Sequence, residues 1–472
     1  MTLHTKHARF VGHLLIVGFG SIGQGVLPLL MRHIDLNPKQ TSIIAADLLG
    51  KAQAESYGIS FENCPLTKEN YEAVLSQRLK PGDFLLNLSV TVSSVALIEF
   101  CHQKRVLYLD TCIEPWAGGY TDPALSLSMR SNYAFRESIL AHKERYAGGP
   151  TAVLTHGANP GLVSHFVKQG LLNIAKDTGV LIDAPKTQQD WGRLAHTLGI
   201  KVIHIAERDT QVTLHPKKPG EFVNTWSIDG FASEGSQPAE LGWGTHEKEL
   251  PSDARRHEFG CDAAIYLLRP GCTTRVRTWT PLEGALYGFL ITHNEAISIA
   301  DYFTLKNEQN VIYRPTVHYA YHPCDDAVLS LHEFCGKEYH LQPVKRLIME
   351  DITTGMDELG VLLMGHEKGA YWYGSQLSIE EVRRIVPNNN ATSLQVTVSV
   401  LAGMIWALNH PDSGVQEADA LDYQQILDIA APYLGRMAGQ YTSWTPLEGR
   451  ARLFPEEVDY EDPWQFKNFR VL

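Results

Sequence analysis

Three glycines, Gly18, Gly20 and Gly23, follow the first apolar run of the chain. We expect the run Leu14–Val17 to be a strand and residues 22–34 to be a helix. Glycines at this spacing permit a tight strand-to-helix turn, close approach of the backbone to a pyrophosphate, and close packing of the helix on the strand. The free N–H groups at the helix start suit phosphate. The pattern predicts a dinucleotide site, and its alternative is a glycine-rich turn that binds nothing.

A second β-like run, residues 42–46, ends on Asp47. This is about where a dinucleotide-binding fold places the carboxylate that accepts a hydrogen bond from the 2′-hydroxyl of ribose. The same carboxylate would repel a 2′-phosphate, so the sequence favours NAD over NADP.

Strand-like and helix-like segments alternate through the first third of the chain, which predicts a doubly wound parallel sheet of the Rossmann type. Ligands of such sheets gather at the carboxyl ends of the strands, which brings forward Asn87, Ser89, Thr111 and Cys112. Each of these is equally well explained as a plain loop residue. The residues predicted to contact the cofactor are Gly18, Gly20, Ser21, Ile22, Gly23, Asp47, Ser89, Thr111, Ala158 and Asn159.

Asn159 and Pro160 follow another β-like run and precede an amphipathic helix that we expect at residues 162–176. Asparagine before proline is typical of the N-cap and first position of a helix. Asn159 either caps this helix alone, or it also lies at the domain junction where cofactor and substrate would meet.

From about residue 200 the chain changes to β-like runs separated by Gly, Pro and Asp, which predicts a second, α+β domain built on a mainly antiparallel sheet. Residues 357–365 and 370–376 are predicted to form a hairpin, and Ser378 with Glu381 is predicted to form a capping box. We expect an NAD-binding domain at 1–152, a substrate-binding and dimerisation domain at 153–385, and a helical region at 386–472. Whether the apolar helix at 393–408 packs on the first domain is left open.

The hexapeptide WTPLEG occurs twice, at residues 279–284 and 444–449. Thr, Pro and Glu in this order predict a helix start with a capping box, which would occupy Glu283 and Glu448 with their own backbone. The first copy would open a helix from residue 282 to 301 with His293 on its apolar face. Glu295 would be turned about 200° away from His293. The alternative for His293 is a core histidine satisfied by a neighbour.

Acidic residues at strand ends and loops are frequent in the second half: Glu207, Glu234 and Asp357, with Glu114 from the first domain. Each can equally be a solvated loop acid. Trp226 precedes Glu234, and an indole face stabilises a cation by about 2 kcal/mol where water is excluded. Its alternative is ordinary core packing.

The composition of the chain limits the classes of protein to which it can belong. The chain has 472 residues, is 44% hydrophobic, and has a net charge of −12, which argues against a nucleic-acid surface and is compatible with a cationic substrate. Its seven cysteines show no CxxC spacing, so we expect free thiols in the cytoplasm. No apolar run approaches the roughly 20 residues of a membrane span, and no HExxH or GxSxG motif is present, so we predict no membrane segment and no metal.

The segments VGFGSIGQGV, HGANPG, IHIAERDTQ, TWSIDGFASEG, THNEAISIADYF and MDELGVLLMG resemble the bacterial homospermidine synthases, which are related in fold to saccharopine dehydrogenases. The resemblance spans nearly the whole chain. It implies transfer of an aminobutyl group from putrescine, or from spermidine, to a second putrescine. Ammonia or diaminopropane is then released, NAD stores the hydride and returns it, and the enzyme is a homodimer.

The resemblance also implies roles for individual residues. It places Trp226 against the cationic centre and makes Glu207 and Glu234 ammonium holders and proton acceptors. Asp357 and Asn159 would orient amines, His293 would assist proton movement, and Glu114 and Glu295 would guide diamines in.

Two other functions remain compatible with these residues. A saccharopine-type or carboxynorspermidine dehydrogenase would reduce an imine and consume NAD(P)H, and its carboxylated substrates call for Arg or Lys in the pocket. A protein that senses NAD without catalysis would need no acidic pocket.

Overall fold

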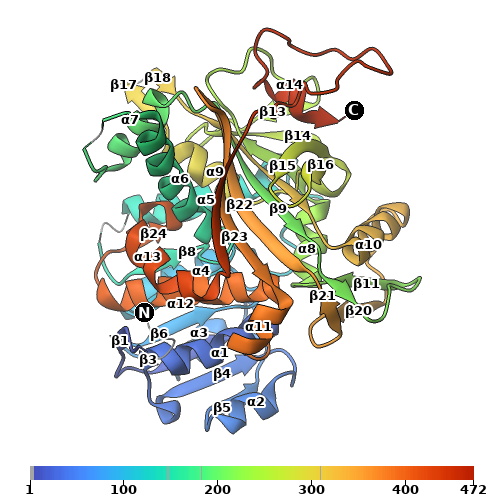
Figure 1. The fold of residues 1–472 in the computed structure, drawn as a ribbon. Helices are drawn as coiled ribbons and strands as arrows, with labels where there is room; N and C mark the ends of the chain where they lie inside the picture. Colours follow the sequence, from blue (N-terminus) through green and yellow to red (C-terminus); the bar gives the residue numbers. More distant parts are fainter. Residues whose placement is uncertain (1–4, 146–147, 182, 309, 472) are drawn as a thin grey trace.

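The computed structural model describes residues 5–145, 148–181, 183–308 and 310–471. The predicted ranges 1–152 and 386–472 begin and end on residues outside this part, residues 1–4 and 472. Two sheets lie one above the other in Figure 1, and helices cover both. The predicted combination of a parallel doubly wound sheet with a second, mainly antiparallel sheet is confirmed.

The lower sheet is parallel throughout, and within the described residues it has seven strands. Its central strands are apolar and fully buried, as expected when helices cover both faces of a parallel sheet. In spatial order the strands are β24 (Val415–Glu417), β8 (Ala152–Leu154), β7 (Leu107–Asp110), β6 (Phe84–Asn87), β2 (Leu14–Val17), β4 (Thr41–Ala45) and β5 (Ser60–Asn63). Helix α1 (Ser21–His33) follows β2 directly, so the glycine turn joins a strand to a helix as predicted.

The upper sheet is mixed, and among the described strands only β9 (Val202–Asp209) and β19 (Thr316–His322) pair in parallel. Strand β22 (Met356–His366) pairs with β9 and with β23 (Gly369–Ser378), which confirms the predicted hairpin. The remaining strands are β12 (Pro238–Gly242), β13 (Ala254–Arg256), β14 (Ala264–Pro270), β15 (Arg275–Thr280), β16 (Gly284–Phe289), β25 (Arg436–Thr442) and β26 (Arg470–Val471).

The C-terminal part of the chain contributes to both sheets. Strand β24 forms the edge of the lower sheet beside β8, and β25 and β26 belong to the upper one. Helix α12 (Ala391–Asn409) lies between the two sheets and contacts α1, β7 and β22 (Figure 1). The sequence left this packing open, and the structure places the helix directly on the first domain.

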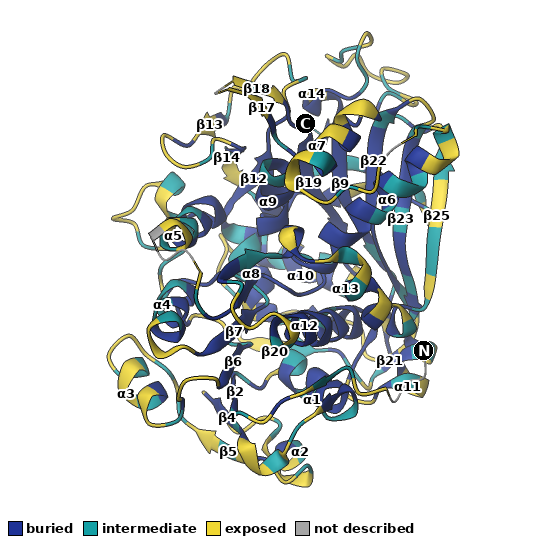
Figure 2. Cartoon of the chain, turned by 90° about the vertical axis from the view of Figure 1, so that its left-hand side faces the viewer, coloured by how far each residue is buried: buried dark blue, intermediate teal, exposed yellow. Residues whose placement is uncertain are grey.

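By length and composition alone, helix α12 could cross a membrane, contrary to the expectation that no apolar run approaches the length of a membrane span. Within its most apolar window, however, 89% of the residues are buried inside the protein. Figure 2 shows this helix in dark blue at the centre of the molecule, whereas exposed yellow segments lie at the periphery near β5 and α3 (Tyr71–Ser76). Helix α12 is therefore a core helix.

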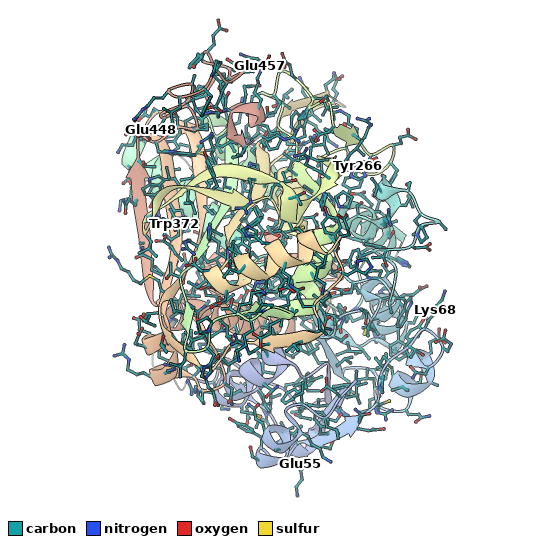
Figure 3. The ribbon with its side chains drawn as sticks, turned by 90° about the vertical axis from the view of Figure 1, so that its right-hand side faces the viewer. Glu55, Lys68, Tyr266, Trp372, Glu448 and Glu457 are labelled. Atoms are coloured by element: carbon teal, nitrogen blue, oxygen red, sulfur yellow. The ribbon has the colours of Figure 1, made fainter. Side chains whose placement is uncertain are left out.

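The helix starts predicted from WTPLEG are wrong in both copies. The first copy forms the turn of the β15–β16 hairpin, in which Thr280 pairs with Gly284. The second copy forms a turn after β25, and Figure 3 shows the exposed Glu448 at the outer edge of the molecule. Glu283 makes an ion pair with Arg208 and does not cap its own backbone. Propensity for a helix start does not decide here because cross-strand pairing with β16 stabilises the extended chain.

Candidate active site

A cavity of about 560 Å³ lies between the two sheets, where the carboxyl ends of the lower strands face β9, β19 and helix α8 (Ile228–Ser236). Most of the predicted residues from both halves of the chain line it. From the cofactor set these are Gly18, Gly20, Ser21, Ile22, Asp47, Ser89, Thr111, Ala158 and Asn159; from the substrate set they are Glu114, Glu207, Trp226, Glu234 and His293.

The glycine turn fits a dinucleotide on steric grounds. A Cβ at Gly18, whose φ is +85°, would stand 2.7 Å from Leu88 O and from Ser89 N, so only glycine allows β2 and β6 to approach here. At Gly20 a Cβ would meet no atom within 4 Å, so this position faces the open cavity. Gly23 does not line the cavity, since it packs against the ring of Phe19. The turn therefore leaves a cradle of backbone N–H groups at the start of α1 that suits a pyrophosphate.

Asp47 is exposed at the end of β4, on the rim of this cradle. One of its carboxylate oxygens, Oδ1, accepts a hydrogen bond from the backbone N–H of Leu49 at 2.8 Å. That bond fixes the carboxylate where a ribose 2′-hydroxyl could donate to its other oxygen.

Glu207 lies at the opposite end of the cavity, on β9, and is 2% exposed. Its Oε2 accepts hydrogen bonds from the Tyr319 hydroxyl and, at 2.9 Å, from Asn159 Nδ2. Burial raises the pKa of Glu207 to about 7, the Tyr319 hydrogen bond opposes the rise, and the nearby Asp209 adds to it. A carboxyl with this pKa is suited to exchange protons near neutral pH.

Asn159 is not the N-cap that the sequence predicts. Helix α6 (Leu162–Thr178) has Gly161 at that position, with a φ of +127° that a side chain would strain. The amide of Asn159 reaches Glu207 instead, across the boundary between the sheets.

His293 is held between two carboxylates. It is the residue before helix α9 (Asn294–Tyr302), and its Nε2 lies 2.9 Å from Glu234 Oε2 while its Nδ1 lies 3.3 Å from Glu295 Oε1. Although burial favours the neutral ring, Glu234 and Glu295 raise the pKa of His293 well above its usual value. Imidazolium is therefore the stable form at neutral pH.

This geometry corrects the predicted placement of Glu295. Because His293 precedes the helix and does not lie within it, the expected 200° separation of the two side chains is wrong. Glu295 is also fully buried and does not line the cavity, so it is not at an entrance where it could guide diamines in.

Asp357 is fully buried on β22 and stands behind the cavity wall. Its Oδ2 accepts a 2.5 Å hydrogen bond from the Thr392 hydroxyl on α12, and its carboxyl neighbours that of Glu207. Burial, and then the charges of Glu207 and Asp209, raise the pKa of Asp357 well above its usual value.

Trp226 is half-buried in the cavity wall, and its indole Nε1 donates to the Tyr321 hydroxyl at 3.2 Å. Glu114 lines the same cavity at 7% exposure, and burial raises its pKa to about 7. Both side chains are therefore placed where an ammonium group could meet them.

Several residues of the site escaped the sequence analysis: Tyr319, Tyr321, Thr392, Asp209 and Lys345. The two tyrosines alternate on β19 with stacked rings, their centroids 5.1 Å apart. The alternation of buried tyrosines in TVHYAYH is the one signal that could have indicated them. Lys345, on β20 (Val344–Leu347), forms an ion pair with Asp229 at the cavity wall.

Two family models match the chain in succession. Residues 14–153 match the saccharopine dehydrogenase NADP binding domain, and residues 157–442 match the saccharopine dehydrogenase C-terminal domain. A homospermidine synthase from Blastochloris viridis is 53% identical over 475 residues, covering 100% of both chains. One from Mesorhizobium japonicum is 50% identical, covering 98% of this chain and 97% of its own. This chain belongs to the homospermidine synthase family.

A solved homospermidine synthase from Legionella pneumophila, in complex with NAD, shares this fold with a TM-score of 0.92. It is 52% identical, and the match covers 98% of each chain. Membership of the homospermidine synthase family, within the saccharopine dehydrogenase-like proteins, confirms the resemblance identified from the sequence segments.

Proposed function

We propose that this cavity joins two diamines into homospermidine, with putrescine as both aminobutyl donor and acceptor. The chain is an enzyme of the homospermidine synthase family, and its cofactor is NAD, as its glycine turn and Asp47 predict. NAD, when bound, accepts a hydride from the amine-bearing carbon of the donor and returns it to the imine formed with the acceptor. Gly18, Gly20 and Ser21 would hold its pyrophosphate, and Asp47 its ribose.

The observation that carries this proposal is the charge of the cavity wall. The acids Asp47, Glu114, Glu207, Asp229 and Glu234 line it. Among the described lining residues the only lysine or arginine is Lys345, which is already paired with Asp229. A carboxylated substrate, as in the saccharopine-type alternative, would find no free cation here.

Amines with a pKa near 10 must lose a proton before they lose a hydride or attack an imine. Glu207, with its pKa of about 7, is the group we assign as the proton acceptor at the buried end of the cavity. Asn159 and Tyr319 hold its Oε2, so the carboxylate keeps one orientation while the proton moves.

The ammonium that is not reacting must be held in place. Taking it out of water costs several kcal/mol, more than one cation–π contact returns, so carboxylates are required as well. We assign Trp226 and Glu234 to this cation, with Asp357 behind Glu207 as a second anion. His293, which Glu234 and Glu295 keep in its charged form, is the group we assign to donate the proton with which the leaving amine departs as ammonia.

Water must be excluded, because it would convert the imine to an aldehyde, and the hydride taken from the donor could then not be returned to the product. Tyr319 and Tyr321 are buried beside Glu207 and Trp226 and present apolar ring faces there.

We further propose that spermidine can replace putrescine as the donor, in which case diaminopropane is released. We also propose that the enzyme is a homodimer and that it is located in the cytoplasm, which is consistent with its seven free cysteines.

A single incubation tests the proposal. Purified enzyme with excess putrescine and a catalytic amount of NAD should form homospermidine and ammonia in equal amounts over many turnovers, without net formation of NADH. Net NADH with no triamine would favour the dehydrogenase alternative. Tight NAD binding with neither product would favour the sensing alternative.

A further inference from the structure

We propose that Asp209 is a positioning residue that keeps one proton shared between Glu207 and Asp357 until a substrate ammonium takes its place. This inference rests on the proposed function. Asp209 lies on β9, is fully buried, and does not line the cavity.

Strand register brings the three carboxylates together. Asp209 and Asp357 are direct cross-strand partners in the β9–β22 ladder, and Glu207 lies opposite Leu359. Residues two apart on a strand point to the same face, so all three side chains lie on one face of the sheet. Three carboxylates at this spacing cannot all be ionised in a site from which water is excluded.

Hydrogen bonds decide which member of the group carries the charge. Asp209 Oδ1 accepts from the backbone N–H of Gln211 at 2.8 Å and from Gln211 Nε2 at 3.0 Å. Its Oδ2 accepts from the Thr225 hydroxyl at 2.8 Å, whereas the Thr392 hydroxyl, 3.5 Å away, donates its single proton to Asp357. Burial raises the pKa of Asp209, but three donors favour its charged form over that of its neighbours.

The Asp357 carboxyl accepts fewer hydrogen bonds than that of Asp209. Thr392 donates to its Oδ2, and its buried Oδ1 has no hydrogen-bond partner among the residues that the structure describes. The Asp357 carboxyl neighbours Glu207, and two such groups beside a fixed anion share a proton. Asp209 thus supplies the charge that holds this proton in the free enzyme.

The described elements packed around the three carboxylates place no cation in direct contact with the Asp209 carboxylate. From β19, Tyr319 and Tyr321 face the group, Cys324 lies beyond them, and His293 offers its charge mainly to Glu234 and Glu295. Arg208 points to the other face of β9 and pairs with Glu283; its charge lowers the pKa of Asp209, and so it too favours Asp209 as the ionised member of the group. Helix α12, which covers the group, has no charged residue. An ammonium entering the cavity is therefore the cation that can replace the proton.

Two substitutions should move the same titration in opposite directions. Asp209→Asn removes the fixed anion, so the acid limb of kcat/KM for putrescine should move down by about one pH unit. Thr392→Val removes the donor that favours charged Asp357, so the limb should move up, while Thr392→Ser should retain the wild-type profile. Glu240→Gln is the matched control, because Glu240 is equally buried, has a pKa raised by burial to about 7, and does not line the cavity.

A limb that is unmoved in Asp209→Asn, or that moves in the same direction in Asp209→Asn and Thr392→Val, would overturn the proposal. Should Asp209→Asn fail to fold, the comparison of Thr392→Val with Thr392→Ser decides it alone.

A second measurement uses the wild-type enzyme. Calorimetric titration of putrescine into enzyme loaded with reduced NAD, which cannot accept a hydride, should show release of about one proton at pH 6.5 and less at pH 8. Comparison of two buffers with different ionisation enthalpies gives this number. Absence of proton release at pH 6.5 would reject the inference. Proton release without any triamine in the turnover assay would reject only the proposed function.

Discussion

The two ends of the cavity recognise their ligands by different means. At the lower sheet the structure offers backbone N–H groups and empty space, because Gly18 and Gly20 have no side chains to fill it. At the upper sheet it offers buried carboxylates, an imidazolium and an indole ring. The first end requires only local chain geometry, whereas the second requires side chains from β9, α8, α9, β19 and β22 to converge. Substitutions should therefore affect the two ends separately.

The largest difference between the effects on the two ends of the cavity is expected for Trp226→Ala. Loss of the indole face should lower kcat/KM for putrescine by about 30-fold or more, the equivalent of about 2 kcal/mol of cation stabilisation. The Kd of NAD, measured by fluorescence titration, should change by less than about twofold because Trp226 does not belong to the glycine turn. Trp226→Phe keeps a ring face and should lose less. Equal losses in NAD affinity and turnover would indicate a folding role and erase the distinction between the ends.

A pH profile tests the same division in the wild-type enzyme. Glu207, with its pKa of about 7, must be ionised to accept a proton, so kcat/KM for putrescine should fall about tenfold per pH unit below about pH 6. Backbone N–H groups do not titrate, so the Kd of NAD should stay within about twofold from pH 5.5 to pH 8. A parallel loss of NAD affinity in this range would mean that the cofactor end also depends on a titrating group.

The smallest effect is expected at the cofactor end. Gly20 has a φ of −72° and open space around its missing Cβ, so Gly20→Ala should fold with an unchanged Tm. Its methyl group would enter the cavity and raise the Kd of NAD by about tenfold, without changing kcat at saturating NAD. Gly336→Ala, also in open space but away from the cavity, is the matched control. An identical Kd in both variants would show that the cofactor does not approach Gly20.

The same contrast explains what could be predicted from sequence. The glycine turn between β2 and α1 and the β22–β23 hairpin depend on neighbours in the chain, and their patterns indicated them correctly. The arrangement around His293 depends on distant residues, so helical spacing misplaced both His293 and Glu295. WTPLEG carries a strong local signal for a helix, yet pairing between β15 and β16 determines the structure of its first copy.

Asp209 and Thr392 show most directly which contacts cannot be predicted from the sequence. Each is an ordinary residue by its local sequence, and they are separated by 183 positions. Only the register of β9 with β22, together with the packing of α12 across both, brings them to the same carboxylate. No periodicity within either segment could indicate that contact.

Strand β24 has a consequence for how the protein is made. It pairs with β8 and completes the edge of the cofactor-binding sheet, although more than half of the chain separates them in sequence. During synthesis, β8 must wait with an open edge until residue 417 has left the ribosome, and such an edge is a site of aggregation. An isolated fragment that ends after β8, at residue 154, would retain this exposed edge and lack α12 as its cover. The cofactor-binding sheet is thus contiguous in space but not in sequence, and most strands of the upper sheet, from β9 to β23, must be synthesised before the lower sheet can close.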